Sequence, residues 1–356
     1  MKICFLGDGS SIHVKRIVEY FSKNGAEVFL ISFIDPKIKR VKFYKLRTSF
    51  SFSDLNYPVN IPLLKKYLQI IKPDVLHAHY ATSYGFMAAC SGFKPLVVSC
   101  WGSDIFVTPR KNILFKGLTN FVLRKADYLT FDSPPVLKRM RELTIKYLRA
   151  KEIVFGVEEK YLHIKKRKNT GKVILSVRGL EPLYNVDKII KAFALISKKN
   201  KNTRLLILGK GSMLVKLKQL TEKLGLRKSI KFYGDQPHHK LPGFLAAADV
   251  FVAVPNSDAI SVSLIEAMAA GVIPVVSNIE SKTCLVRDGV NGYVLEPGIT
   301  VTSTGVAAKI QEALDNTVKI SSIIKINKAL VAKKYLFAKN MEKLRKIYKF
   351  LILESK

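Results

Sequence analysis

Cysteine is scarce in this sequence and long apolar runs are missing, and both absences narrow what the chain can be. The four cysteines are widely spaced and form no CxxC pair or Cys/His cluster, which argues against a disulfide framework and against a zinc site. We therefore expect a reducing, cytoplasmic environment. No run of about 18 apolar residues occurs, and the apolar start at residues 3–6 is too short for a signal peptide. We expect no membrane span.

Acidic residues are also in deficit. The chain holds 27 Asp and Glu against 60 Lys and Arg, a net charge of +33. Residues 1–160 hold 26 basic against 13 acidic residues and residues 161–356 hold 34 against 14, so both halves are basic. Three explanations are open: a nucleic-acid partner, an anionic membrane surface, or a lysine-rich composition without a partner. No recognisable nucleic-acid module is present, so we expect no nucleic acid and favour peripheral docking on a membrane. The densest basic runs are residues 37–42, 138–141 and 165–168.

At 356 residues the chain exceeds the size at which one hydrophobic core stops growing, so two domains are expected. Short β-like runs alternate with helical patterns, which is typical of parallel α/β sheets. The first half predicts strands at residues 2–6, 28–33, 74–79, 96–100, 128–132 and 153–156. It predicts helices at residues 13–24, 62–71, 83–91, 117–125 and 135–148.

Periodicity stops in a polar stretch, residues 158–171, which we interpret as a linker. The second half predicts strands at residues 172–177, 204–208, 230–233, 249–255 and 272–277, and helices at residues 185–199, 213–223 and 239–247. Two lysine-rich helical patterns follow within residues 316–355. We expect Rossmann-like domains at residues 1–157 and 172–330, facing each other across a deep cleft, and a final helix at 331–356 that packs back on the first domain.

The most informative segment is Asp258-Ala-Ile-Ser-Val-Ser-Leu-Ile-Glu266, between an apolar strand and the helix that leads to the next strand. Such a loop lies at the carboxyl end of a parallel strand, where ligands bind, and the helix N-terminus favours a phosphate. Asp258 in the loop and Glu266 in the helix would then accept hydroxyl groups, as a sugar nucleotide offers. A structural explanation is equally open: Ser263 and Glu266 fit a capping box, and Asp258 fits a turn.

An ordered set of motifs resembles the retaining glycosyltransferases of family 4, of glycosyltransferase group 1 type. In the second half these are residues 175–182, 206–211, 232–235, 245–251, 258–271 and 286–294, and in the first half 77–85 and 101–104. The resemblance spans nearly the whole chain in the right order. It implies the α/β GT-B fold, with an acceptor-binding N-terminal domain and a nucleotide-sugar-binding C-terminal domain.

The resemblance also implies roles for individual residues. Glu266 would hold the donor ribose, Asp258 would bond hydroxyls of the transferred sugar, and Arg178 would clamp the diphosphate. The remaining donor-side candidates are Gly9, Ser10, Gly209, Lys210, Ser261 and Val262. The acceptor-side candidates are Ser11, His79, Trp101 and Asp104, with His79 also a catalytic candidate beside Arg178 and Asp258.

Three positions depart from the family pattern. Asp258 replaces a glutamate, Tyr184 stands near the place of a lysine, and Trp101 stands where many members have a histidine. We interpret these changes as the mark of a subgroup with its own donor.

Several polar residues keep a structural alternative. His79 either contacts sugar or is a satisfied buried residue, and Asp104 either contacts acceptor or caps a helix. His77 and His79 share one face of a strand but lack a third ligand, so we expect no metal there.

The expected activity is transfer of a hexose-type sugar from a nucleotide-diphosphate donor to a lipid-linked or polysaccharide-type acceptor, with retention and without a metal or cofactor. The sequence contains no Asp-x-Asp cluster of the kind that metal-dependent transferases use. Two alternatives remain: another GT-B enzyme, such as a sugar-nucleotide epimerase or a sugar-phosphate synthase, and a non-catalytic partner that binds sugar nucleotide or membrane.

Overall fold

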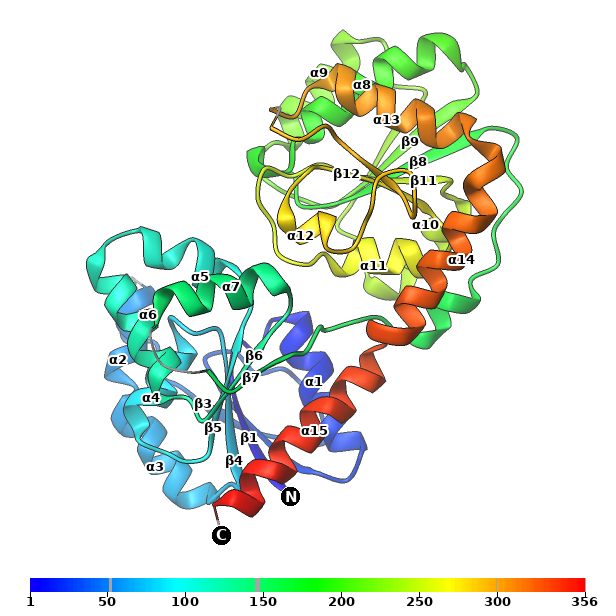
Figure 1. Cartoon of the computed structure of the whole chain (residues 1–356). Helices are drawn as coiled ribbons and strands as arrows, with labels where there is room; N and C mark the ends of the chain where they lie inside the picture. Colours follow the sequence, from blue (N-terminus) through cyan, green and yellow to red (C-terminus); the bar gives the residue numbers. More distant parts are fainter. Residues whose placement is uncertain (51–52, 145–147, 299, 356) are drawn as a thin grey trace. The chain divides into compact units, whose positions relative to one another are not determined.

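The computed structural model describes residues 1–50, 53–144, 148–298 and 300–355. The chain forms two compact units: unit 1 is Met1–Phe155 with Ala338–Lys356, and unit 2 is Gly156–Phe337. Each unit is built on one parallel sheet with helices on both faces (Figure 1). The predicted fold class of two Rossmann-like α/β units is therefore confirmed.

Unit 1 contains a seven-stranded sheet in the order β3-β2-β1-β4-β5-β6-β7. Its strands are β1 (Lys2–Leu6), β2 (Glu27–Ser32), β3 (Val41–Lys45), β4 (Val75–His79), β5 (Leu96–Cys100), β6 (Tyr128–Phe131) and β7 (Ala150–Glu152). Its helices are α1 (Ile12–Lys23), α2 (Asn56–Val59), α3 (Ile61–Ile71), α4 (Tyr84–Ser91), α5 (Ser103–Phe106), α6 (Ile113–Lys125), α7 (Pro134–Leu143) and α15 (Phe337–Glu354). The strand order reverses between β1 and β4, the switch point where doubly wound sheets bind ligands.

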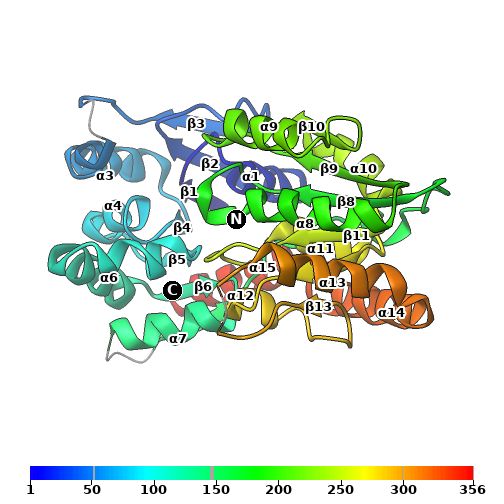
Figure 2. The ribbon, with the colours of Figure 1, turned by 90° about the horizontal axis from the view of Figure 1, so that it is seen from above.

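The inner strands β1, β2, β4, β5 and β6 are buried on both faces, which explains why they read as continuous apolar runs. Cys4 and Leu6 of β1 face the core formed with α3, α4, α6 and α7, which lie along one side of the sheet in Figure 2. On the opposite face the ring of Phe5 lies 5.9 Å from Phe21 of α1 and 6.5 Å from Tyr348 of α15, centroid to centroid. The last helix of the chain thus completes the core of unit 1.

A buried chain of hydrogen bonds attaches α15 to the sheet. His77 Nδ1 lies 2.5 Å from the Tyr348 hydroxyl, and His77 Nε2 lies 2.7 Å from Ser99 Oγ. Ser99 Oγ is in turn 2.6 Å from Thr130 Oγ1. Burial lowers the pKa of His77 well below its usual value, so the ring is neutral. His77 therefore has a structural role.

Unit 2 contains a six-stranded sheet in the order β10-β9-β8-β11-β12-β13. Its strands are β8 (Lys172–Val177), β9 (Thr203–Leu208), β10 (Ile230–Gly234), β11 (Val250–Ala253), β12 (Ile273–Val276) and β13 (Tyr293–Val294). Its helices are α8 (Val186–Lys199), α9 (Leu214–Lys223), α10 (Leu241–Ala247), α11 (Val262–Ala269), α12 (Glu280–Thr283), α13 (Ser303–Asp315) and α14 (Thr317–Lys334). Short 3₁₀ turns include η3 (Glu159–His163), η4 (Pro182–Tyr184) and η5 (His238–Lys240).

The core of unit 2 joins the sheet to α8, α9 and α13. Helix α11 packs against both α14 and η3, and α10 packs against β8. None of the helices in the described part of the chain is long and apolar enough to cross a bilayer.

Several predicted elements differ from the structure. The last strand of unit 1 is β7 rather than residues 153–156, because the ring of Phe155 packs 4.3 Å from that of His13 instead. Strand β3, which overlaps the end of the basic run at residues 37–42 and continues to Lys45, was not predicted. The predicted helix at 135–148 ends at Leu143, and its positions 145–147 lie outside the described residues.

The predicted boundaries also differ. The polar stretch 158–171 belongs to unit 2, where Tyr161 is fully buried in η3 and Arg167 donates its N–H to the carbonyl of Ala246. The chain rejoins unit 1 at Ala338 rather than at residue 331, since α14 continues to Lys334 within unit 2.

Candidate functional site

The carboxyl ends of three neighbouring strands of unit 2 carry the predicted donor-side residues. Arg178 directly follows β8, Gly209 directly follows β9, and Asp258 lies in the loop between β11 and α11. These strands are parallel neighbours in the order β9-β8-β11, so their carboxyl ends lie at the same edge of the sheet. The polar residues that follow them therefore lie close together. Loops at this edge of a parallel sheet are the usual ligand sites.

Arg178 and Asp258 form an ion pair at this edge. Arg178 Nη2 donates to Asp258 Oδ2 at 2.5 Å and Arg178 Nη1 donates to Ser261 Oγ at 2.8 Å. The side chains of Arg178 and Asp258 are only 12% and 14% exposed. The guanidinium also lies over the ring of Tyr184, 4.6 Å from its centroid, and its buried Nε has no hydrogen-bond partner among the described residues. The predicted residues Arg178, Asp258 and Ser261 are thus brought together.

A third charged group, Lys282 of α12, was not predicted. Its side chain is fully buried, and its Nζ donates to Asp258 Oδ2 at 2.5 Å and to the carbonyl of Ala259 at 3.2 Å. Burial lowers the pKa of Lys282 to about 8, a shift that the Asp258 carboxylate opposes and that the nearby Arg178 increases. No local pattern in the sequence distinguishes this lysine from the others.

Gly209 and Lys210 have different environments. Gly209 has φ +133°, and a Cβ at this position would lie 2.0 Å from the carbonyl oxygen of Arg178. Glycine is therefore required for the chain after β9 to pass against Arg178. The Lys210 side chain is exposed and its Nζ lies 3.0 Å from Asp235 Oδ2, a surface contact of small energetic value.

Glu266 is buried in α11 and its Oε1 lies 2.6 Å from His238 Nε2. His238 Nε2 also lies 3.2 Å from the hydroxyl of Tyr161. The capping-box alternative is wrong, because α11 begins at Val262 after the N-cap Ser261, and the Glu266 carboxylate meets His238 instead. The first N–H groups of α11, beginning at Val262, have no partner within the helix. His238 is a second residue of this edge that the sequence did not single out.

In unit 1 the loop after β1 contains the glycine and serines predicted to approach the ligands. A Cβ on Gly9 would lie 1.9 Å from the carbonyl oxygen of Ile34, so packing within unit 1 already requires this glycine. Ser10 donates from both N–H and Oγ to the Asp8 carboxylate at 2.8 Å. Ser11 is the N-cap residue of α1, without a side-chain capping bond.

His79 lies at the end of β4 in an aromatic cluster. Its ring is stacked 5.9 Å from Phe5 and lies 5.2 Å from Trp101, and the ring of Trp101 also contacts His13 and Phe155. His79 is fully buried, and neither of its ring nitrogens nor Trp101 Nε1 has a hydrogen-bond partner among the described residues. Burial lowers the pKa of His79 to about 3, so the ring is neutral near pH 7.

Asp104 ties two loops of unit 1 together. Its Oδ2 accepts the N–H of Ala81 at 2.7 Å and its Oδ1 accepts the N–H of Trp101 at 3.0 Å. The residue is fully buried, which raises its pKa to about 6 despite these bonds. The N-cap of the short helix α5 is Gly102, so the capping alternative for Asp104 is wrong.

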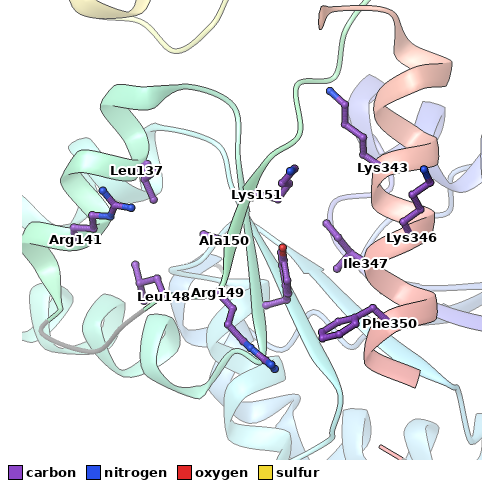
Figure 3. Close-up of a pocket in the computed structure, with 11 residues that line it drawn as sticks. Leu137, Arg141, Leu148, Arg149, Ala150, Lys151, Lys343, Lys346, Ile347 and Phe350 are labelled. Carbon is purple, nitrogen blue, oxygen red and sulfur yellow. The ribbon is translucent and has the colours of Figure 1, made fainter. Parts of the chain in front are cut away.

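A groove of about 730 Å³ lies on unit 1 along the edge strand β7 and contains none of the predicted site residues. Figure 3 shows Arg141 of α7 on one side of the strand and Lys343 and Lys346 of α15 on the other. The lining residues are Tyr128, Leu137, Arg141, Leu148, Arg149, Ala150, Lys151, Lys343, Lys346, Ile347 and Phe350. The lining combines five cations with apolar side chains and includes no acidic residue.

Metal-ligating residues do not cluster in the described part of the chain: no three His, Cys, Asp or Glu side chains there are placed to hold an ion. At the edge of unit 2, Arg178 and the first N–H groups of α11 are the groups placed to meet an anion, and Lys282 contacts Asp258 behind them.

Comparison with known proteins agrees with this architecture. Residues 157–330 match the family model of glycosyl transferases group 1, and residues 2–133 match the glycosyl transferase 4-like model. N-acetyl-alpha-D-glucosaminyl L-malate synthase from Bacillus anthracis is 23% identical over 322 residues, 84% of this chain and 82% of that protein. HepE from Anabaena, solved in complex with UDP and glucose, has a TM-score of 0.78 at 18% identity, covering 99% of this chain and 100% of that one. Sucrose-phosphate synthase from Thermosynechococcus elongatus has a TM-score of 0.82 at 16% identity, with the same coverage.

Two successive Rossmann-like sheets with a last helix returned to the first unit are the architecture of GT-B glycosyltransferases, and the similar structures share it. The chain belongs to the group 1 glycosyltransferases, and its N-terminal half is of the glycosyltransferase 4-like type. The family predicted from the motifs is thus confirmed.

Proposed function

We propose that this glycosyltransferase moves a hexose-type sugar from a nucleotide-diphosphate donor to a lipid-linked or polysaccharide-type acceptor, with retention of the anomeric configuration. The observation that carries the proposal is the buried cluster of Arg178, Asp258 and Ser261 at the switch-point edge of unit 2. In this cluster Arg178 would bind the diphosphate, and the Asp258 carboxylate beside it would accept hydrogen bonds from the sugar hydroxyls. Glu266, on the helix that starts at this cluster, would bind the ribose.

The chemistry required is stabilisation of a departing diphosphate. The planar guanidinium of Arg178 can donate to two phosphate oxygens at once, and its buried Nε has no acceptor among the described residues. The N–H groups at Ser261 and Val262 would add fixed dipoles that need no reorganisation during the reaction. In this scheme the donor phosphate accepts the acceptor proton, so no separate base is required.

The named relatives support this donor class. HepE was solved with UDP and glucose, and the N-acetyl-alpha-D-glucosaminyl L-malate synthase is named for a product that carries an N-acetylglucosaminyl group. The aromatic cluster of His79 and Trp101 in unit 1 would contact the acceptor, because its buried ring nitrogens have no hydrogen-bond partner among the described residues.

A two-step experiment tests the proposal. Thermal-shift screening against uridine, guanosine, thymidine and adenosine diphosphates selects the nucleotide, because a ligand stabilises the state that binds it. Turnover of the matching nucleotide sugar with membrane extract is then compared between wild type, Glu266→Ala and Arg178→Ala. Glu222→Ala and Arg227→Ala are the matched controls, since this pair is exposed on the same unit. Equal turnover in all five proteins would refute the donor site.

The same assay separates the alternatives. A sugar phosphate is an alternative acceptor, because a sucrose-phosphate synthase has a similar structure. Product analysis identifies the acceptor. An epimerase would convert the donor without any acceptor. We propose that no metal takes part, so turnover should persist when a chelator is added; loss of activity on chelation, restored by a divalent cation, would contradict this.

We also propose that unit 1 docks on an anionic membrane surface through the β7 groove. Each basic residue near such a surface contributes about 1 kcal/mol. Lys151→Gln with Lys346→Gln should weaken co-sedimentation with phosphatidylglycerol vesicles at low salt, because both side chains are exposed in the groove. Lys216→Gln with Lys228→Gln removes the same charge from exposed positions of unit 2. Equal loss in both double variants would mean that net charge alone causes the binding.

A further inference from the structure

Among the lysines and arginines of the described chain, Lys282 stands out because its side chain is fully buried. The resemblance to family 4 gives it no role, and it lies on α12, 24 positions from Asp258. Its Nζ and Nη2 of Arg178 both donate to the same oxygen, Oδ2 of Asp258. Two cations therefore share one carboxylate oxygen, and the three ionised groups together carry a net charge of +1.

Burying a second cation beside one carboxylate costs free energy of folding. Burial disfavours the charged form of Lys282, which is reflected in its lowered pKa. One cation would suffice to neutralise Asp258. The second becomes useful when the first is needed elsewhere, because removing one partner of a buried ion pair strongly destabilises the charge left behind.

The donor creates that situation. Under the proposed function, the diphosphate draws Arg178 away from Asp258 while the sugar requires Asp258 to stay ionised and fixed. Lys282 remains at Oδ2, held also by the carbonyl of Ala259, and leaves Oδ1 for a sugar hydroxyl. The arrangement also suits the short side chain of Asp258, since Lys282 holds the carboxylate in place.

We propose that Lys282 is a positioning residue that keeps Asp258 ionised and oriented for the transferred sugar when Arg178 binds the donor diphosphate. The inference rests on the proposed function of the Arg178 and Asp258 site. It adds a residue of the reaction that the motifs do not contain.

The test compares Lys282→Met and Lys282→Arg with wild type, using UDP-glucose or the glucose conjugate of whichever nucleotide the thermal-shift screen selects. Lys282→Met should lower kcat/KM for the donor on the order of 10- to 100-fold, and Lys282→Arg should restore most of it. Lys309→Met is the matched control, because Lys309 is 14% exposed and pairs with Asp288 at 2.9 Å on the same unit. The control should keep kcat/KM within about 3-fold of wild type.

A double-mutant cycle separates positioning from a general structural effect. Lys282→Met should add little to Asp258→Asn, because the neutral amide needs no counter-ion, whereas an independent structural role gives multiplied losses. Calorimetric affinity for the intact donor replaces kcat/KM where a variant turns over too slowly. The pH profile is a further readout: kcat/KM of wild type should fall as pH rises above about 8, and that fall should be absent in Lys282→Arg.

The outcomes are distinguishable. Lys282→Met with wild-type kcat/KM, or with losses that multiply with those of Asp258→Asn, overturns the inference about Lys282. If Arg178→Ala and Glu266→Ala also turn over donor as wild type does, the proposed donor site itself fails. If those two variants lose turnover while Lys282→Met keeps it, only the inference about Lys282 fails.

Discussion

Acid should destabilise unit 1 through its two buried neutral histidines. Burial lowers the pKa of His79 to about 3 and that of His77 well below its usual value near 6.5. Below pH 6.5 the unfolded chain takes up a proton on each ring while the folded chain does not, so stability is lost as pH falls toward 3. At about pH 5 this amounts to about 2 kcal/mol for His79, and the lowered pKa of His77 acts in the same direction.

Asp104 acts in the opposite direction and reduces the loss of stability that the two histidines cause at acid pH. Its pKa rises from 3.8 to about 6 on folding, so the folded chain takes up a proton first and gains stability as pH falls from 6 toward 3.8. The gain at about pH 5 is about 1.4 kcal/mol. Between about pH 7 and pH 5, the loss of stability from the two histidines should exceed the gain from Asp104, so unit 1 should become less stable.

Urea unfolding followed by the fluorescence of Trp101 measures this loss. Trp101 is the only tryptophan and its ring lies 5.2 Å from that of His79, so the signal reports on unit 1. In His79→Phe the loss should shrink by about 2 kcal/mol, because phenylalanine can stack on Phe5 and takes up no proton. His239→Gln, an exposed position of unit 2, is the control. A His79→Phe protein that loses as much stability as wild type would refute the reasoning.

Three further predictions concern single side chains. Gly209→Ala should destabilise unit 2 by about 3 kcal/mol or more, because its Cβ would meet the carbonyl of Arg178, whereas Gly225→Ala, with φ +70° and no close neighbour, should cost less in thermal unfolding. Tyr348→Phe removes the hydroxyl beside His77 and should cost about 1–3 kcal/mol in urea unfolding; an unchanged midpoint would contradict that bond. Tyr184→Leu removes the ring below Arg178, so calorimetry should give about 5-fold weaker nucleoside diphosphate binding.

Much of the fold follows from the sequence because strands buried on both faces leave unmistakable apolar runs. Those runs end where Arg178 and the loop of Asp258 begin, so the position of both residues at the sheet edge was predictable. Strand β3 was not, because as an edge strand it keeps exposed lysines beside a few apolar residues.

The contacts of the site were less predictable than its location. Lys282 and His238 reach Asp258 and Glu266 from separate elements, and only the folded chain reveals which of many basic residues arrive there. The capping box also illustrates this limit: Ser263 and Glu266 have the right spacing, but the helix begins at Val262, so the motif falls out of register with the helix end.

The return of α15 to unit 1 has a consequence for synthesis of the protein. The Tyr348 side chain completes a hydrogen-bonded core whose other members, including His77, emerge from the ribosome far earlier. At 5–20 residues per second the intervening unit 2 delays the helix by roughly 10 to 40 seconds. During that interval the nascent first unit presents an uncovered apolar face, and unit 2 can fold before unit 1 is complete. Release of a chain truncated before α15 should therefore yield a folded second unit attached to an aggregation-prone first one.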